Sequence, residues 1–459
     1  MSQITEFLDW LERELPRLLD AHSVPAASVG VYFEGETAVH AAGVLSARTR
    51  VEADTESVFQ IGSITKVWTA TLVMQLVDEG LLDLDDPVRV HLPEFSVADE
   101  GASARITVRQ LLSHTAGFSG DDAVDTGRGD DAVQKLMPHL VSCRQLFSPG
   151  EMFSYNNAGY SVLGRIVEVL RGMPYNAALR QHLIVPLGLR DVAPTAYEAV
   201  LFRAAVGHLQ IDLSVPPVPT PVWAMESSNA PAGTLLAMTA RELLGFARLH
   251  VTGGLAPDGS RVLSAESVGA MQSRQVELPP LGFMGDAWGL GWAITDTENG
   301  PVIGHDGGTL GQNAFLRIVP GSDFAVCLLS NGGDPIALYR AIVAKAVEEF
   351  TGVVVPEFPV PAEERPRVHA DRYLGTYSSE VTDTTVRQDD DGRLWMDRRM
   401  KGGFADLQTP DPIELVHHEG DTFIADEPLL GVYMLHSFLG DDGAGRAKYL
   451  HTGRADVRV

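Results

Sequence analysis

The first 22 residues, MSQITEFLDWLERELPRLLDAH, place apolar side chains at helical spacing with acidic residues between them. The apolar positions are Ile4, Phe7, Leu8, Leu11, Leu15, Leu18 and Leu19. Because residues three and four positions apart share one face of a helix, this pattern predicts an amphipathic first helix. A secretory signal would have a basic start and an unbroken apolar core instead, so we expect a cytoplasmic protein.

Alternation of polar and apolar residues follows this helix. The segment AASVGVYFEGETAVHAAGV alternates about Gly35, which predicts a β-hairpin. The next part is mostly helical with long loops, to about Asp191, and begins with a helix in KVWTATLVMQLVDEG. Short strands are then expected in GLGWAITD, PVIGHDGG, NAFLRIVP and FAVCLLSN, followed by an amphipathic helix in PIALYRAIVAKAVEEF. Strands near both ends with helices between them indicate an α+β fold, in which one antiparallel sheet carries an inserted helical subdomain.

A change of composition divides the chain. Residues 353–368, VVVPEFPVPAEERPRV, contain four prolines, cannot continue the helix and predict a linker. Beyond the linker, short strands separated by turn residues indicate a small all-β barrel or sandwich. These strands are expected in RYLGTYSS, TTVRQDDDGRLWMD, DTFIAD, VYMLHSFL and AKYLHTG. We therefore expect domains at 1–352 and 369–459, joined by 353–368.

Composition narrows the function classes. Hydrophobic residues make up 45% and charged residues 21% of the 459 residues, and no apolar run approaches the roughly 18 residues of a membrane span. The formal net charge of -26 argues against a nucleic acid or an anionic membrane as partner. Cys143 and Cys327 lie far apart in apolar settings, so we expect two reduced core thiols rather than a disulfide or a metal site. No cofactor is expected.

The stretch FQIGSITKVWTA places a serine one helical turn before a lysine among small and apolar residues. At positions i and i+3 of a helix, Lys66 can reach the hydroxyl of Ser63. An amine in apolar surroundings tends to lose its proton, and a neutral lysine can then activate a serine nucleophile. The alternative is a helix N-terminus with Ser63 as its cap and Lys66 on the surface.

Two later motifs carry further candidate residues. SPGEMFSYNNAGYSVLGRIVEVL places Tyr155 and Asn157 in a loop just before an amphipathic helix, and a tyrosine near a cationic lysine can have a lowered pKa and shuttle protons. VIGHDGGTLG places His305 at a strand end before Gly307 and Gly308, where a strand edge can offer an N–H group to an oxyanion. The alternative for Tyr155 and Asn157 is that they are turn and capping residues. The alternative for the second motif is a hydrogen-bonded loop histidine followed by a glycine hairpin turn.

Taken together and in this order, S-x-x-K, Y-x-N and H-x-G resemble the motifs of the penicillin-binding and class C β-lactamase-like serine hydrolases. The resemblance runs from roughly residue 20 to residue 350. It includes the flanks QIGSITKVWTATLVMQLVDEGLLDLDDPV, ITVRQLLSHTAGF, PGEMFSYNNAGYSVLGRIVE and PAGTLLAMTARELLGFARLH. It implies a β-lactamase/transpeptidase-like domain, with Ser63 as the acylated nucleophile, Lys66 as its base and Tyr155 as the group that protonates the leaving group.

The same resemblance implies roles for the remaining motif residues. Asn157 would bind an amide of the substrate, and the N–H groups of Ser63 and Gly308 would form the oxyanion hole beside Gly307. His305 stands where penicillin-binding proteins and most β-lactamases carry a lysine that binds a substrate carboxylate. Histidine at this place is usual in the esterase, amidase and transferase branches, so we expect inefficient hydrolysis of β-lactams.

The chain length, the expected absence of a signal segment and the small β domain together resemble the penicillin-binding-protein-type thioesterases. These stand-alone enzymes release a nonribosomal peptidyl thioester, free or on a peptidyl carrier protein, as a head-to-tail cyclic peptide. The resemblance implies a D-residue at the end of the peptide and a lipocalin-like C-terminal domain that walls the acyl pocket. By position, GDDGAGRAKYLHTG would present Arg446 toward the site, although an exposed hairpin arginine is the alternative.

Two other function classes stay open. The first is a hydrolase of the same superfamily, a D-stereospecific aminopeptidase, amidase or esterase, whose acyl acceptor is water. The second is a non-catalytic binding protein that has kept the fold. The presence of Ser63, Lys66 and Tyr155 together argues against the second class.

Overall fold

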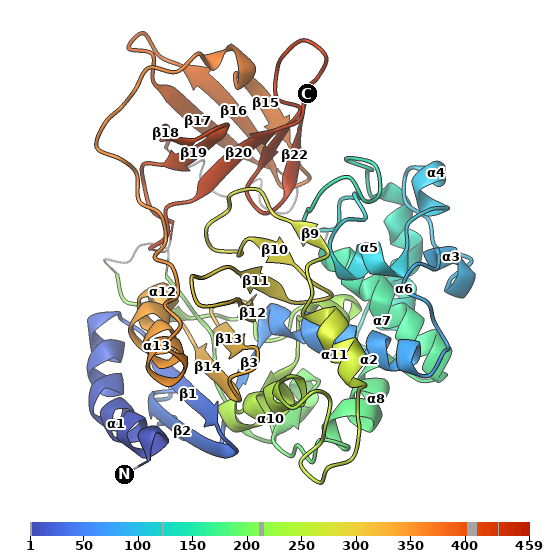
Figure 1. The fold of residues 1–459 in the computed structure, drawn as a ribbon, viewed down its shortest axis with the longest axis vertical. Coiled ribbons are helices and arrows are strands. Elements are labelled where there is room, and N and C mark those ends of the chain that lie inside the picture. The colour runs from blue at the N-terminus through green and yellow to red at the C-terminus, as the bar shows by residue number, and fades with distance from the viewer. Residues whose placement is uncertain (1, 122–123, 211–214, 402–410, 430) are drawn as a thin grey trace.

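The computed structural model of the protein describes residues 2–121, 124–210, 215–401, 411–429 and 431–459. At its centre lies an eight-stranded antiparallel sheet with the order β2-β1-β14-β13-β12-β11-β10-β9 (Figure 1). The strands are β1 (Ala26–Phe33), β2 (Glu36–Gly43), β9 (Val276–Glu277), β10 (Ala287–Trp288), β11 (Ala293–Thr295), β12 (Val302–Gly308), β13 (Asn313–Val319) and β14 (Phe324–Ser330). Gly30 of β1 pairs with Cys327 of β14, so the two ends of this region meet in one sheet, as predicted.

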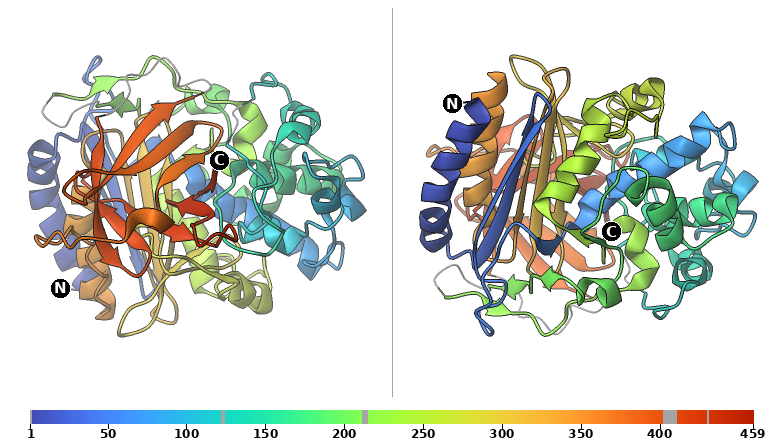
Figure 2. Two further views of the ribbon diagram at one scale, coloured as in Figure 1. Left: turned by 90° about the horizontal axis from the view of Figure 1, so that it is seen from above. Right: turned by 90° about the horizontal axis from the view of Figure 1, so that it is seen from below.

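Helices cover both faces of the sheet, as the right view of Figure 2 shows. One face carries α1 (Gln3–Ala21) and the continuous helical run α12 (Pro335–Leu338), η5 (Tyr339–Ala344) and α13 (Lys345–Thr351). The prediction of an amphipathic first helix is confirmed, because α1 buries Phe7, Leu11 and Leu15 and packs Phe7 against Phe350 of α13. The other face carries α10 (Ala240–Val251) and α2 (Thr65–Asp78). No helix among the described residues has the length and apolarity to cross a membrane.

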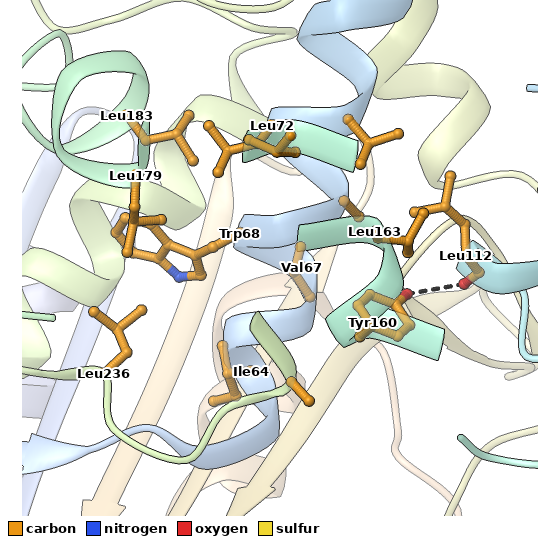
Figure 3. Close-up of a cluster of buried hydrophobic side chains, with 14 of the residues drawn as sticks. Ile64, Val67, Trp68, Leu72, Leu112, Tyr160, Leu163, Leu179, Leu183 and Leu236 are labelled. Atoms are coloured by element: carbon orange, nitrogen blue, oxygen red, sulfur yellow. Dashed lines mark hydrogen bonds between the residues drawn. The ribbon is translucent and has the colours of Figure 1, made fainter. Parts of the chain in front are cut away.

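The helix α2 follows a 3-10 turn, η1 (Gly62–Ile64), and is buried on all sides over Thr65–Leu76. Because no face of this segment is exposed, α2 is a core helix. Trp68 stacks on Phe246 of α10 with ring centroids 4.0 Å apart. Figure 3 shows Val67 and Trp68 surrounded by leucines from neighbouring segments. The core thus fixes the turn and first helical residues that carry the S-x-x-K motif.

The helical subdomain packs around α2 and supplies most of these neighbours. Its helices are α3 (Val88–His91), α4 (Glu100–Ser103), α5 (Val108–Leu112), α6 (Ala132–Leu136), η2 (Met137–Ser142), α7 (Asn157–Arg171), α8 (Tyr175–Leu179) and η3 (Arg180–Ile184). Further short elements complete the region: β3 (Ser57–Gln60), β4 (Val192–Ala193), α9 (Ala196–Ala199), β5 (Arg203–Ala204), β6 (His208–Leu209), β7 (Val218–Pro219), η4 (Ser227–Ala232), β8 (Ala237–Met238) and α11 (Ala265–Met271). Cys143 and Cys327 are buried thiols, as predicted.

After residues 353–368, which form no helix or strand, a 3-10 turn η6 (Ala370–Arg372) leads into a closed barrel of eight strands. The α+β fold class with a C-terminal barrel is therefore confirmed. The strands are β15 (Gly375–Ser378), β16 (Thr382–Gln388), β17 (Leu394–Met400), β18 (Ile413–Glu419), β19 (Thr422–Ala425), β20 (Leu435–Leu439), β21 (Tyr449–His451) and β22 (Ala455–Arg458). The sequence pattern did not indicate β18 or β22, because IELVHHE is rich in polar residues and ADVR is too short to show alternation.

The last hairpin of the barrel, β21–β22, is joined to the loop that carries Tyr155. The backbone N–H of Tyr155 donates to Gly453 O at 3.0 Å, and that of Ala455 donates to Ser154 Oγ at 3.2 Å. His451 donates through Nε2 to Phe153 O at 2.7 Å. Because three successive residues of this loop are held by the hairpin, the barrel helps to set the position of Tyr155.

Candidate active site

Ser63 and Lys66 are in direct contact at the start of α2. The Lys66 Nζ atom lies 3.0 Å from Ser63 Oγ and 2.6 Å from Ala232 O, and the lysine is 0% exposed. Burial holds the pKa of Lys66 well below its usual range, the positive charge of Arg454 lowers it further, and Asp121 opposes both. The surface-lysine alternative is wrong. A neutral amine here can take the proton of the Ser63 hydroxyl.

Tyr155 lies against the same amine, with Lys66 Nζ 4.8 Å from the centre of its ring. The expectation of a lowered tyrosine pKa is wrong. Burial raises the pKa of Tyr155, and a hydrogen bond with Ser63 offsets this only in part. The physical reason is that the lysine is itself driven toward its neutral form, so it offers little stabilisation to a phenolate. Tyr155 is therefore a phenol that can relay a proton rather than a standing anion.

Backbone-to-backbone contact joins the serine turn to β12. A Cβ atom added to Gly307 would lie 1.9 Å from Ile61 O and 3.1 Å from Ser63 N. A Cβ added to Gly62, whose φ is +52°, would lie 2.5 Å from Gly308 N. Only glycine permits this approach, which brings the backbone nitrogens of Gly308 and Ser63 to one place. Two such N–H groups can stabilise an oxyanion.

His305 is buried at the edge of this site, 5.4 Å from Trp288 and 6.2 Å from Tyr155 between ring centroids. Burial and the nearby Lys66 lower its pKa to about 3, so the ring is neutral at physiological pH. Its Nδ1 donates to Asp306 O at 2.7 Å. Its buried Nε2 has no hydrogen-bond partner among the described residues and therefore presents a lone pair.

Asn157, the first residue of α7, donates through Nδ2 to Asp121 Oδ1 at 3.0 Å. The same carboxylate accepts from Arg454 Nη2 at 3.1 Å. Arg454 follows β21 in the last hairpin of the barrel, and its guanidinium lies 5.0 Å from the ring centre of Tyr155. A chain of polar contacts thus connects the barrel to the start of α7.

The structure places Arg446 elsewhere. It lies in the β20–β21 connection, its guanidinium pairs with Asp442 at 2.7 Å, and its side chain is 54% exposed. The expectation that Arg446 faces the site is therefore wrong, and the exposed-hairpin alternative is correct. Arg454 was missed because β22, the strand that positions it, shows no pattern in the sequence.

His114 is a second residue that the motifs did not identify. It is 1% exposed, and its ring centroid lies 4.4 Å from that of Tyr155. Its Nδ1 accepts from the backbone N–H of Asn156, whose side chain caps α7 through Gly159 N. The segment LLSHTAGF, noted above only as a family-like flank, was the available signal. His114 supports the Tyr155 ring from behind.

A pocket of about 210 Å³ opens beside these residues. It is lined by both domains: Tyr155, Phe283, Met284, Gly285, Trp288, Ala293, Thr295, Gly304, His305, Asp306, Arg317, Thr452 and Arg454. Asp306 and Arg317 form an ion pair at 2.5 Å in its wall. Apolar walls with a few polar groups are typical of small-molecule sites. The described residues contain no group of three His, Cys, Asp or Glu side chains placed to hold a metal ion.

Comparison with known proteins places this site in a family context. A family model described as Beta-lactamase matches residues 11–348. Penicillin-binding protein 4 of Amycolatopsis lactamdurans is 44% identical over 374 residues, which cover 81% of this chain and 97% of that protein.

Two solved structures illustrate the similarity in fold. SurE with D-Leu superposes with a TM-score of 0.78 and 31% identity, covering 99% of this chain and 100% of that one. The D-amino acid amidase from Ochrobactrum anthropi SV3, complexed with L-phenylalanine amide, gives a TM-score of 0.61 and 22% identity. It covers 73% of this chain and 99% of its own, so it shares the fold of the first domain.

We expect a fluorophosphonate probe to label Ser63 stoichiometrically, because its hydroxyl lies beside a neutral amine and an oxyanion site. Peptide mapping by mass spectrometry would locate the label. Ser63→Ala should abolish labelling while circular dichroism and the Tm stay close to those of the wild type. Stoichiometric labelling of the alanine variant would refute the nucleophile assignment.

The proton relay predicts a non-additive pair of variants. Lys66→Ala and Tyr155→Phe should each lower kcat/KM by about 100-fold or more, the usual scale of general acid–base catalysis. Because both side chains serve one relay, the double variant should lose far less than the product of the single losses. Steady-state kinetics with an activated peptidyl ester measures this. Losses that simply multiply would mean that the two residues act independently.

Proposed function

The chain belongs to the β-lactamase family of serine acyl-transfer enzymes, and from this premise we propose that it releases peptidyl thioesters as head-to-tail cyclic peptides. The observation that carries the proposal is the pocket wall that the barrel supplies. Thr452 and Arg454 line the pocket together with Tyr155 and His305. The likeness to SurE extends over 99% of the chain and so includes the barrel. This supports the resemblance to penicillin-binding-protein-type thioesterases.

Acylation uses the contacts at the start of α2. The neutral Lys66 amine takes the proton of Ser63 Oγ as that oxygen attacks the thioester carbonyl carbon. The oxyanion that forms is held by the backbone N–H groups of Ser63 and Gly308. The carbon–sulfur bond then breaks, and the leaving thiolate receives a proton from the Tyr155 hydroxyl, which Lys66 restores. We assign Asn157 to hydrogen-bond an amide of the acyl chain.

Release as a ring requires that an amine of the same chain reach the ester before water does. An intramolecular amine in ideal geometry can act at an effective concentration of about 10⁵ to 10⁸ M. A wall that bends the acyl chain back and limits water favours this outcome. The β21–β22 hairpin is suited to that task, because its Gly453 and Ala455 backbone groups bond to the loop that carries Tyr155.

The alternative within the family is a D-stereospecific aminopeptidase, amidase or esterase, with water as the acceptor. The amidase from Ochrobactrum anthropi SV3 matches 73% of this chain, which leaves about a quarter of the chain without a counterpart in it. The match to SurE, which covers 99% of the chain and so includes the barrel, supports the cyclase over this amidase. The proposal includes a D-residue at the acyl end, delivery on a peptidyl carrier protein and a cytoplasmic location. The net charge of -26 fits a peptide rather than a nucleic acid as partner.

We predict mainly cyclic product from N-acetylcysteamine thioesters of peptides of roughly five to ten residues that end in a D-residue, because the bound amine outcompetes water. The epimer that ends in an L-residue should react poorly. Mass spectrometry separates the two outcomes, since hydrolysis adds one water and cyclisation does not.

The matched variant for this test is Arg454→Gln. It should shift the product from cyclic toward linear while a fluorophosphonate still labels Ser63, because Arg454 belongs to the wall and not to the relay. Exclusive formation of linear acid by the intact enzyme, across several D-ended thioesters with free N-termini, would defeat the cyclase proposal and favour the hydrolase.

We also predict negligible turnover of benzylpenicillin beside that of a peptidyl thioester. With a pKa of about 3, His305 offers no positive charge to the carboxylate of a β-lactam at neutral pH. Spectrophotometric hydrolysis assays between pH 6 and pH 8 should find slow turnover throughout this range, because the ring stays neutral in it. Penicillin hydrolysis as fast as peptide release would contradict this account.

A further inference from the structure

The interior of the barrel changes character along its length. Its middle is filled by an apolar cluster that includes Tyr377, Leu394, Phe423 and Phe438. Toward the end that bears the β21–β22 turn, the inward positions become polar. The inward polar residues there are Thr384 of β16, Arg398 of β17, His436 of β20 and Asp456 of β22. Arg398 shares the inward face of its strand with Leu394 and Met396.

A hydrogen bond crosses the barrel at this level, because β17 and β20 are not neighbours in the strand order. Arg398 donates through Nη2 to His436 Nε2 at 3.1 Å. His436 can accept this bond because its Nδ1 donates to Met434 O at 3.0 Å, which leaves the lone pair on Nε2. Burial and the charge of Arg398 lower the pKa of His436 to about 3, so the acceptor is a neutral ring. This bond orients the guanidinium but does not neutralise it.

Arg398 has no ion pair with any described residue, and neither has Asp456. Arginines on the outer face of the same sheet do have such pairs: Arg399 with Asp383 at 2.6 Å and Arg387 with Asp397 at 2.7 Å. Burial lowers the pKa of Arg398, and the nearby carboxylate of Asp456 opposes this shift. Burial also raises the pKa of Asp456 to about 7. Arg398 is partly buried, and a partly desolvated cation without a bonded anion is unfavourable. A ligand that supplies the anion would relieve this cost.

The polar group lies next to the acyl pocket. Asp456 follows Arg454 by two residues, which is about 7 Å of extended chain. Arg454 lines the pocket with Tyr155, and β22 leads from the active-site turn into the barrel wall. On β20, Ser437 beside His436 donates to Pro280 O of the first domain at 3.0 Å. The polar end of the barrel is therefore the end that faces the catalytic domain.

We propose that Arg398, His436 and Asp456 form a subsite that binds a carboxylate-bearing side chain of the acyl substrate. Arg398 has donors left for a bidentate bond to the carboxylate, which is the geometry that a guanidinium favours. His436 holds the guanidinium in place, and Asp456 in its protonated form donates a further hydrogen bond. The inference rests on acyl transfer at Ser63, by either acceptor, and adds a preference for an acidic residue upstream of the ester.

The test uses N-acetylcysteamine thioesters of a hexapeptide ending in D-leucine, with glutamate or glutamine at each internal position in turn. At one position we expect the glutamate peptide to have a KM about tenfold lower than the glutamine peptide. Arg398→Gln should abolish this preference by raising the KM of the glutamate peptide to that of the glutamine peptide. Arg399→Gln, one residue along the same strand and facing outward, should keep the preference.

Two results would overturn the subsite: no preference for glutamate at any position in the wild type, or an equal rise of KM for both peptides in Arg398→Gln. If Arg398→Gln does not fold, as judged by circular dichroism, the wild-type comparison alone decides. Binding of the free hexapeptide acids to Ser63→Ala, followed by calorimetry, should show the same preference without turnover. Failure of acylation by every peptide would refute the proposed function, whereas acylation without a glutamate preference would refute only the subsite.

Discussion

The site depends on the complete exclusion of the Lys66 amine from solvent. Lys66 is 0% exposed and stands between Ser63, the carbonyl of Ala232 and the rings of Tyr155 and Tyr160. Moving an ammonium group from water to such a place is unfavourable, which lowers the pKa of Lys66 and favours the neutral amine, a base. The helix α2, which is buried on all sides over Thr65–Leu76, and the helical subdomain that encloses it supply this environment. Burial of a lysine usually destabilises a fold, but here it allows Lys66 to activate Ser63.

A second constraint is the close approach of two backbones. The turn that carries Ser63 can meet β12 only because Gly62 and Gly307 have no side chains there. Two hydrogen bonds of Gln60, which precedes the serine turn, fix the position of this turn relative to the residues that follow β12. The backbone N–H of Gln60 donates to Gln312 Oε1 at 3.0 Å, and Thr309 donates to Gln60 Oε1 at 2.7 Å. The serine turn and the strand edge thus form one rigid unit.

The barrel also helps to position the residues of the active site. Its last hairpin holds the backbone of the Tyr155 loop, and Arg454 joins Asp121, which also receives the amide of Asn157. Figure 1 and the left view of Figure 2 together show that the barrel lies over one end of the central sheet. Residues of both domains, among them Tyr155 and Arg454, therefore line one pocket.

The sequence by itself determined what depends on neighbours along the chain. The i, i+3 spacing of Ser63 and Lys66, the amphipathic α1 and the hairpin about Gly35 are all local patterns, and the structure contains them. Only the tertiary structure decided which barrel arginine reaches the pocket, that His114 supports Tyr155, and that the tyrosine pKa rises instead of falling. These facts depend on burial and on contacts between segments up to 333 residues apart, as between Asp121 and Arg454, and no local pattern encodes such distances.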